Sequence, residues 1–227
     1  MKEYFIDPST YYFQPSSKPL SYSQFSQDLN VLRFFDYKTN GFFVELGAGD
    51  GQDLSNTLLL EKNYGWRGIL IEPNPKHLES LQTLRKNSAI SSGLCFSEAG
   101  KIVEFTFADH LSGISDNIAK YTDILSNGNS TKMITTTLTQ VFDDLHAPPI
   151  IDYLSLDTEG SELDILQGVD FNRYNFLYIT IEHNDLEPQR SMLRQFLESK
   201  GYRWYQKNSV DDDYVFAGAE FFCTHCR

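Results

Sequence analysis

The sequence predicts an α/β protein whose mostly parallel sheet is covered by helices on both faces. Near-continuous apolar segments alternate with amphipathic ones along the chain, which is typical of parallel strands buried between helices. The 227 residues, 41% of them hydrophobic, suit one domain with a sizeable core. We expect residues 1–20, rich in Tyr, Pro and Ser, to form an irregular arm, and residues 21–227 to form a single domain.

Eight segments have the apolar or alternating pattern of strands. The last two flank the turn Ser209–Asp213, which predicts a closing antiparallel hairpin. The expected strands are Phe42–Leu46, Gly68–Glu72, Ile90–Phe96, Lys101–Phe107, Ile150–Leu156, Phe176–Ile181, Tyr202–Gln206 and Tyr214–Ala217.

Helical spacing of apolar residues and helix start and stop signals predict five helices between these strands. Pro188 and Gly201, for example, bracket an amphipathic segment with Leu193, Phe196 and Leu197 on one face. The expected helices are Ser21–Tyr37, Asp53–Lys62, Pro75–Lys86, Ser161–Gln167 and the segment between Pro188 and Gly201.

Residues 109–133 are a long polar segment rich in Ser, Asn, Asp and Gly. Long connections of this kind in compact domains are often binding loops or lids, although low hydrophobicity is also typical of disorder. We expect Asp109–Lys132 to form a wall or lid beside the acceptor, with disorder as the alternative.

Charge and targeting signals limit the partners and the compartment. The formal net charge of −12, without a dense Lys/Arg run, opposes binding to nucleic acid or to an anionic membrane. The first ten residues lack the apolar stretch of a secretory signal, and no apolar run approaches the ~20 residues of a membrane span. Three cysteines do not make a disulfide framework, and we expect Cys95 to be a packed thiol. Cys223, His225 and Cys226 lack a second ligand pair, so we do not expect them to form a metal site. A reducing, cytoplasmic location fits these features best.

The segment Phe42–Gly51 predicts a ligand-binding turn. A buried strand runs into three glycines, Gly47, Gly49 and Gly51, at every second position. Glycine permits positive φ and lets backbone amides approach a nucleotide-like ligand closely. The dinucleotide fingerprint requires a glycine at position 52, where this chain has Gln52.

Four expected strands end in an acid: Glu45, Glu72, Asp157 and Glu182. Ligands of such sheets bind beyond the carboxyl ends of the strands, so these side chains are expected at the binding edge. Glu72 follows Gly49 by 23 residues and is placed to accept both ribose hydroxyls of a bound nucleoside, with Pro73 fixing the turn beside it. Glu45 either faces an amino group of the ligand or orders the glycine turn.

Three segments together resemble the FkbM family of S-adenosylmethionine-dependent methyltransferases. They are Phe42–Trp66 with its Glu-Leu-Gly-Ala-Gly-Asp-Gly, Gly68–Pro73, and Ile151–Glu162 with its Asp-Thr-Glu-Gly-Ser-Glu. The resemblance covers roughly residues 21–218. It implies a Rossmann-like class I methyltransferase fold, with a seven-stranded mostly parallel sheet and an antiparallel C-terminal hairpin. It also implies O-methyl transfer to a hydroxyl of a sugar, glycan or polyketide-like small molecule.

The resemblance also implies which residues bind S-adenosylmethionine. The turn from Gly47 to Gly51 would hold the methionine end, and Gln27 with Asp28 would close over the cofactor. Ser55, Asn56 and Thr57 either contact the cofactor or cap the following helix. The expected cofactor-binding residues are Gln27, Glu45, Gly47, Ala48, Gly49, Gly51, Asn56, Thr57, Glu72, Pro73 and Ser97, the last on the adenine side.

Methyl transfer to a hydroxyl also requires removal of a proton, by a general base or by a metal that lowers the hydroxyl pKa. Asp157, Glu182 and His183 are the expected catalytic residues, and His183 has an unperturbed pKa (~6.5) suited to a base. Related methyltransferases hold Mg²⁺ at these strand ends, which implies Asp157, Glu182 and Asn184 as its ligands. Glu159 and Glu162 are either further members of this edge or structural.

Two other classes of protein remain open from the sequence alone. One is a nucleotide- or NAD-binding enzyme of similar fold, against which Gln52 counts. The other is a non-catalytic methyltransferase-like binding module, against which the intact glycine turn and Glu72 count.

Overall fold

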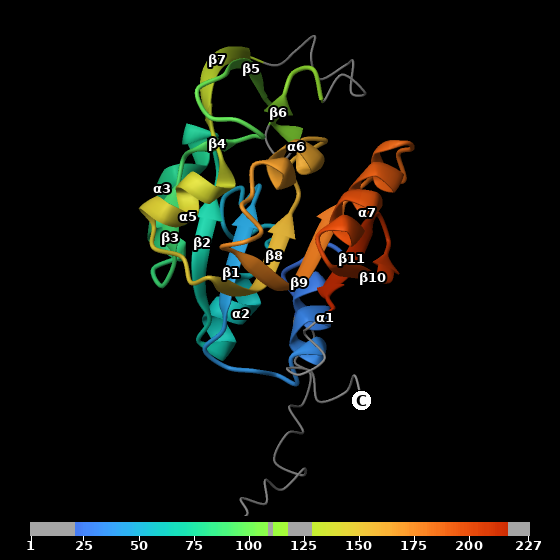
Figure 1. Ribbon diagram of the computed structural model, residues 1–227. Coiled ribbons are helices and arrows are strands. Elements are labelled where there is room, and N and C mark those ends of the chain that lie inside the picture. Colours follow the sequence, from blue (N-terminus) through green and yellow to red (C-terminus); the bar gives the residue numbers. More distant parts are fainter. Residues whose placement is uncertain (1–20, 109–110, 118–128, 218–227) are drawn as a thin grey trace, which may run out of the picture.

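The computed structural model describes residues 21–108, 111–117 and 129–217, and its main sheet has seven strands (Figure 1). The strand order is β10-β11-β9-β8-β1-β2-β3. Neighbours from β3 to β9 pair in parallel, and β11 pairs antiparallel with both β9 and β10. This confirms the predicted mostly parallel sheet with an antiparallel C-terminal hairpin. The strands are β1 (Phe42–Leu46), β2 (Arg67–Ile71), β3 (Ala89–Ser91), β8 (Ile150–Leu156), β9 (Asn175–Glu182), β10 (Tyr202–Asn208) and β11 (Asp211–Phe216).

Helices cover both faces of this sheet and enclose two apolar clusters. Along β1, Phe43 belongs to the cluster under α1, α2 and α3, whereas Val44 and Leu46 belong to the cluster under α5, α6 and α7. This alternation follows from the period of two along a strand. The helices are α1 (Gln27–Phe34), α2 (Leu58–Tyr64), α3 (Pro75–Leu84), α5 (Leu138–Asp144), α6 (Glu162–Gln167) and α7 (Gln189–Ser199).

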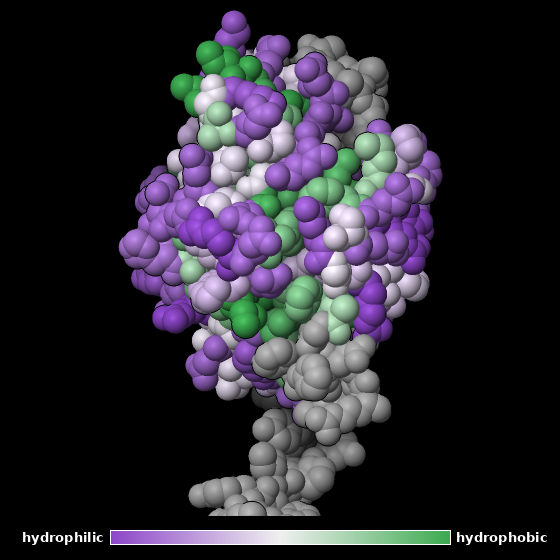
Figure 2. All heavy atoms as spheres, in the orientation of Figure 1, coloured by the Kyte–Doolittle hydropathy of each residue, from purple (hydrophilic) through white to green (hydrophobic). Residues whose placement is uncertain are grey.

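A second, four-stranded sheet stands over the carboxyl ends of the central strands (Figure 1). Its order is β4-β7-β5-β6, with β4 (Leu94–Cys95), β5 (Ile102–Phe107), β6 (Gly113–Ile114) and β7 (Asn129–Thr136). The sequence did not indicate β6 or β7, because β7 is polar and mostly exposed. On the face shown in Figure 2, hydrophobic residues are visible on this upper sheet, and the cross-strand pair Ile102 and Ile134 is 68% and 69% exposed.

The prediction of one strand over Ile90–Phe96 is wrong, because the chain changes sheets within that segment. β3 ends at Ser91 in the main sheet and β4 begins at Leu94 in the second. Gly93 lies at the crossing, where a Cβ would come within 2.8 Å of Thr136 Cγ2. Cys95 is buried in β4 and burial raises its thiol pKa to about 12, which confirms the prediction of a packed thiol.

Two helices start later than their apolar patterns predicted, and each delay has a local cause. Before α1, Asp28 accepts hydrogen bonds from Ser21 Oγ (2.6 Å) and Tyr22 N (2.9 Å), which folds this segment back as a loop. Before α2, the backbone amide of Asn56 is bound by the Glu45 carboxylate at 2.6 Å. The sequence also missed α5, which a capping box of Thr137 and Gln140 starts.

Candidate active site

A cavity of about 320 Å³ opens at the carboxyl ends of the central strands. One part is lined by the glycine turn after β1 and by Glu72 and Pro73 after β2. Another part is lined by Asp157, Glu159 and Glu182 after β8 and β9. The second sheet contributes a wall that includes Phe105 and residues 111–114. The volume lies at the lower end of the range typical of small-molecule sites.

The glycine turn leaves room for a ligand and packs closely against the end of β8. Gly47 has φ +74°, and a Cβ there would lie 1.8 Å from the carbonyl oxygen of Asp157. The amides of Gly47 and Ala48 both donate to the carbonyl of Ile71, at 3.1 and 3.3 Å. These two hydrogen bonds tie the turn to β2, while Gly47, Ala48 and Gly49 line the cavity.

Glu72 joins the turn to the next strand end. Its Oε2 accepts from Gly49 N (2.9 Å) and its Oε1 from Asn74 N (2.7 Å). Burial raises the Glu72 pKa to about 7, although both backbone hydrogen bonds lower it. Each carboxylate oxygen has a second lone pair, so the side chain fits the predicted pair of ribose hydroxyls.

Glu45 orders the segment after the glycine turn. Its carboxylate accepts from Ser55 Oγ (3.1 Å), Asn56 N (2.6 Å) and Thr57 Oγ1 (2.5 Å). These hydrogen bonds give Glu45 a structural role in the segment 55–57. Glu45 also lines the cavity, so its predicted contact with an amino group of the ligand stays a prediction. Thr57 is fully buried in the same network and does not line the cavity.

Arg85, which the sequence did not single out, completes this network. Arg85 is only 1% exposed. Its Nε donates a hydrogen bond to the Glu61 carboxylate at 2.8 Å. The other guanidinium nitrogens donate to Thr57 Oγ1 at 2.7 Å and to the Gly51 carbonyl oxygen at 3.2 Å. A Cβ on Gly51 would lie 3.0 Å from Arg85 Cγ, so this glycine serves close packing and does not line the cavity. No sequence signal distinguishes Arg85 from a solvated residue at a helix end.

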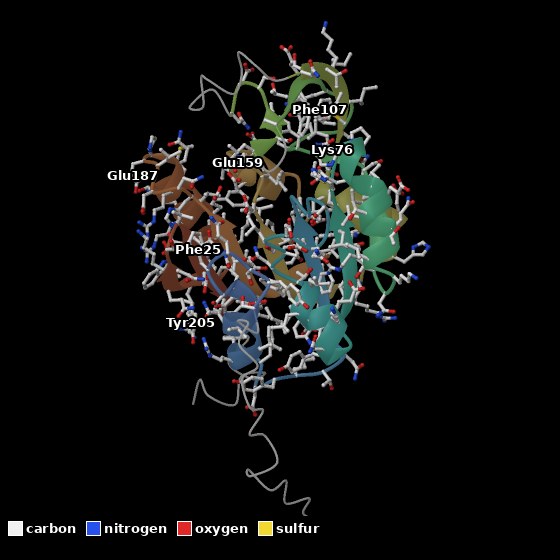
Figure 3. All side chains as sticks on the ribbon, turned by 180° about the vertical axis from the view of Figure 1, so that it is seen from behind. Phe25, Lys76, Phe107, Glu159, Glu187 and Tyr205 are labelled. Carbon is white, nitrogen blue, oxygen red and sulfur yellow. The ribbon has the colours of Figure 1, made fainter. Side chains whose placement is uncertain are left out.

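Three carboxylates meet at the other part of the cavity. Asp157, Glu159 and Glu182 each offer an oxygen, and these oxygens lie within 4.8 Å of one another. Burial, followed by the neighbouring carboxylates of Glu182 and Glu159, raises the Asp157 pKa well above its usual range. Glu159, labelled in Figure 3 below the second sheet, has φ +58° and is buried.

Two neighbours hold these acids in place. Glu162 accepts from Thr158 N and Gly160 N, both at 3.0 Å, so it is structural and fixes the loop that carries Glu159. Asn184 donates from Nδ2 to Glu182 Oε2 at 2.8 Å, so the structure gives it an orienting role beside the acids. Glu159 thus joins Asp157 and Glu182 in the acidic set, and Asn184, which also lines the cavity, stays a predicted ligand.

The structure does not bring His183 or Ser97 to the cavity, which corrects two predicted positions. His183 Nδ1 accepts from Asp185 N (2.9 Å), and its Nε2 lies 3.6 Å from Asp212. Burial lowers the His183 pKa, and the residue packs against β11, away from the lining. Ser97 follows β4 in the second sheet, so the change of sheets at Gly93 removes it from the predicted adenine side.

The start of α1 borders the cavity through Gln27, which the resemblance implies as a cofactor-binding residue. Its Nε2 donates to Asp211 (2.7 Å), and Asn208 donates to the carbonyl of Phe25 (3.0 Å). Phe25 accordingly lies beside the C-terminal strands in Figure 3. Much of the expected lid and the cluster of Cys223, His225 and Cys226 lie outside the described residues.

The strand order, the glycine turn after β1 and the acid after β2 together define the fold of S-adenosylmethionine-dependent methyltransferases. A family profile described as the methyltransferase FkbM domain matches residues 45–204, well over half of the chain. The chain belongs to the FkbM methyltransferase family.

The solved structures that are similar to this chain are distant from it in sequence. One is a precorrin-6y C5,15-methyltransferase from Geobacter metallireducens (14% identity, TM-score 0.47, covering 83% of this chain and 86% of that one). Another is a putative RNA methyltransferase from Pyrococcus horikoshii (12% identity, TM-score 0.42, covering 84% of this chain and 83% of that one). A third is M. jannaschii TYW2 in complex with AdoMet (14% identity, TM-score 0.39, covering 84% of this chain and 77% of that one). A comparison with curated proteins gives no significant match.

Within the described residues, no helix has the length and apolar character of a membrane span.

Proposed function

We propose that this methyltransferase acts on a hydroxyl oxygen of a sugar, glycan or other small molecule. The observation that carries the proposal is that one cavity joins two chemically different parts. Glu72 and the glycine turn suit a nucleoside, whereas Asp157, Glu159 and Glu182 suit the activation of an acceptor. The net charge of −12 favours a small-molecule acceptor over nucleic acid.

When bound, S-adenosylmethionine supplies an electrophilic methyl group. The residues of this chain then have two tasks, which are to position the acceptor oxygen and to take up its proton. Asp157 is suited to the second task, because its carboxylate lines the cavity beside Glu159 and Glu182.

The three carboxylates also fit a divalent cation such as Mg²⁺, which prefers oxygen ligands. We propose Asp157, Glu159 and Glu182 as the residues that would hold it, with Asn184 orienting Glu182. A cation there would relieve the repulsion that raises the Asp157 pKa and would lower the pKa of the acceptor hydroxyl. A cytoplasmic location remains part of this proposal.

Removing single acids tests the proposed acceptor site. We expect Asp157→Asn and Glu182→Gln each to lower methyl transfer by at least about 10²-fold, the lower end of the contribution of a general base. The assay measures S-adenosylhomocysteine release in the presence of a panel of sugars, glycosides and polyketide-like alcohols. His183→Gln is the matched control, since His183 is buried outside the cavity, and it should keep most of the activity.

Chelator separates the two ways of activating the hydroxyl. Loss of activity with excess chelator, restored by Mg²⁺, indicates the cation; activity that is insensitive to chelator but lost in Asp157→Asn indicates a general base. Loss of activity in His183→Gln together with full activity in both acid variants would refute the proposed site.

A further inference from the structure

The charged side chains that line the cavity in the described part of the chain are all acidic. Six of the described lining residues are carboxylates, and none of them is a lysine, an arginine or a histidine. Asp157, Glu159 and Glu182 form what we call the acceptor end of the cavity. Burial, followed by the carboxylates of Glu182 and Glu159, raises the pKa of Asp157, as expected where the electrostatic potential is negative. An anion that enters the acceptor end therefore meets repulsion and no counter-charge from the described residues.

Cationic side chains of α7 and β10 are bound to other acids and are not directed at the cavity. Arg190 donates from Nε and Nη2 to the two carboxylate oxygens of Asp212, in both cases at 2.8 Å. Lys207 Nζ donates to Asp185 at 2.7 Å. These four residues are not part of the cavity lining. The two ion pairs hold both cations at the C-terminal strands, so neither cation is placed to neutralise a ligand in the cavity.

The second sheet borders the acceptor end with apolar side chains. Leu111 and Ile114, before and in β6, line the cavity. The segment that follows β6 lies on the loop that carries Glu159, because Asn117 Nδ2 donates to Ser161 Oγ at 2.9 Å. An apolar surface offers a phosphate no hydrogen bonds, so an anion placed there loses water without a replacement.

An uncharged sugar or alcohol suits these surroundings better than its phosphate. Its hydroxyls can donate to the carboxylates, and its C–H groups can pack against the apolar wall. A phosphate adds negative charge beside three acids. A divalent cation at the acceptor end does not reverse this preference, since three ionised carboxylates outweigh the charge of one such ion.

We propose that the acceptor end admits uncharged hydroxyl compounds and rejects those that carry a phosphate beside the reacting ring or chain. This inference rests on the proposed function and names the class of acceptor within it. Where the acceptor is a sugar, the reaction that supplies the substrate is glycosyl transfer. In that reaction the anomeric carbon gains a new C–O bond, and the nucleoside diphosphate leaves with the electron pair of the broken bond. Methyl transfer by this enzyme follows that step.

Pairs of acceptors that are alike in size and differ in charge test the proposal. Each uncharged acceptor, an isopropyl glycoside or a polyketide-like diol, is paired with the sugar 1-phosphate or with the monophosphate of the diol. Release of S-adenosylhomocysteine from S-adenosylmethionine is measured with Mg²⁺ present. We expect kcat/KM to be at least about 10²-fold lower for the phosphates, because like charges in contact oppose binding strongly.

Two outcomes of this assay contradict different claims. Equal or higher kcat/KM for the phosphates, together with activity on the uncharged acceptors, would overturn this inference and leave the proposed function in place. Release with no member of either set would refute the proposed function, and this inference with it.

A charge placed in the apolar wall separates electrostatic exclusion from exclusion by shape. Leu111→Arg adds a cation to the lining and should narrow the difference between uncharged and phosphate acceptors by at least about 10-fold. Leu111→Gln is the matched control, since it is polar and uncharged, and should keep the wild-type difference. Calorimetric titration with S-adenosylhomocysteine establishes that both variants keep a folded cofactor site. An unchanged difference in a folded Leu111→Arg would overturn the proposal, because shape and not charge would then exclude the phosphates.

Discussion

Arg85→Met should destabilise the protein by about 3–5 kcal/mol, the usual cost of removing one partner from a buried ion pair. Arg85 is enclosed between Glu61, at 2.8 Å, and Glu45, at 3.6 Å, and all three are nearly inaccessible to solvent. Without the guanidinium, two buried carboxylates lose their counter-charge and Thr57 loses a donor. Urea unfolding of wild type and variant measures the difference.

Arg173→Met is the matched control, because Arg173 pairs with Asp143 on the surface, where ion pairs contribute little. Its unfolding midpoint should stay close to that of wild type. Arg85→Lys should lie between wild type and Arg85→Met, since a lysine keeps the charge and loses the planar fork of donors. A loss below about 1 kcal/mol in Arg85→Met would show that the network around Glu45 is not needed to hold the segment 55–57.

Glu72→Ala should weaken S-adenosylhomocysteine by about 10- to 150-fold, which corresponds to ~1.5–3 kcal/mol for hydrogen bonds to a charged group. The carboxylate that would accept the ribose hydroxyls is removed, and the amides of Gly49 and Asn74 lose their acceptor. Titration calorimetry measures the change. Glu79→Ala, an exposed carboxylate on α3, is the control and should bind normally.

The Glu72 pKa of about 7 adds a pH signature to this prediction. Ribose hydroxyls donate to the ionised form, so binding favours ionisation, and the affinity should rise between pH 6 and pH 8 with release of a proton. In Glu72→Gln this pH dependence should disappear. Wild-type affinity in Glu72→Ala would contradict the assignment of this residue to the ribose.

The central strands β1, β2, β8 and β9 were predictable because they are almost wholly buried and therefore apolar. β1 and β8 begin and end at the predicted residues. The last strand was predicted to begin at Tyr214, whereas β11 begins at Asp211, because three buried aspartates open it and were assigned to the turn. The second sheet was not predictable, because β6 has two residues and β7 is polar and exposed, so neither carries a periodic pattern. The change of sheets at Gly93 depends on a close approach to Thr136 that no local sequence pattern encodes.

Part of the site was predictable for a similar reason. Acids at strand ends share one edge of a parallel sheet, so Glu72, Asp157 and Glu182 were indicated as cavity residues, and all three line it. Side-chain direction was not predictable. His183 follows Glu182 directly yet packs away from the cavity, and Glu45 faces a buried arginine from a distant helix end.

A crystal structure with S-adenosylhomocysteine tests the central claim most directly, namely that one cavity holds the cofactor and the acidic acceptor site together. The ribose should lie against Glu72 and the amino acid against the glycine turn. The sulfur, which marks the position of the departed methyl group, should face Asp157, Glu159 and Glu182. A sulfur directed away from these three carboxylates, or a ligand bound outside this cavity, would contradict the account.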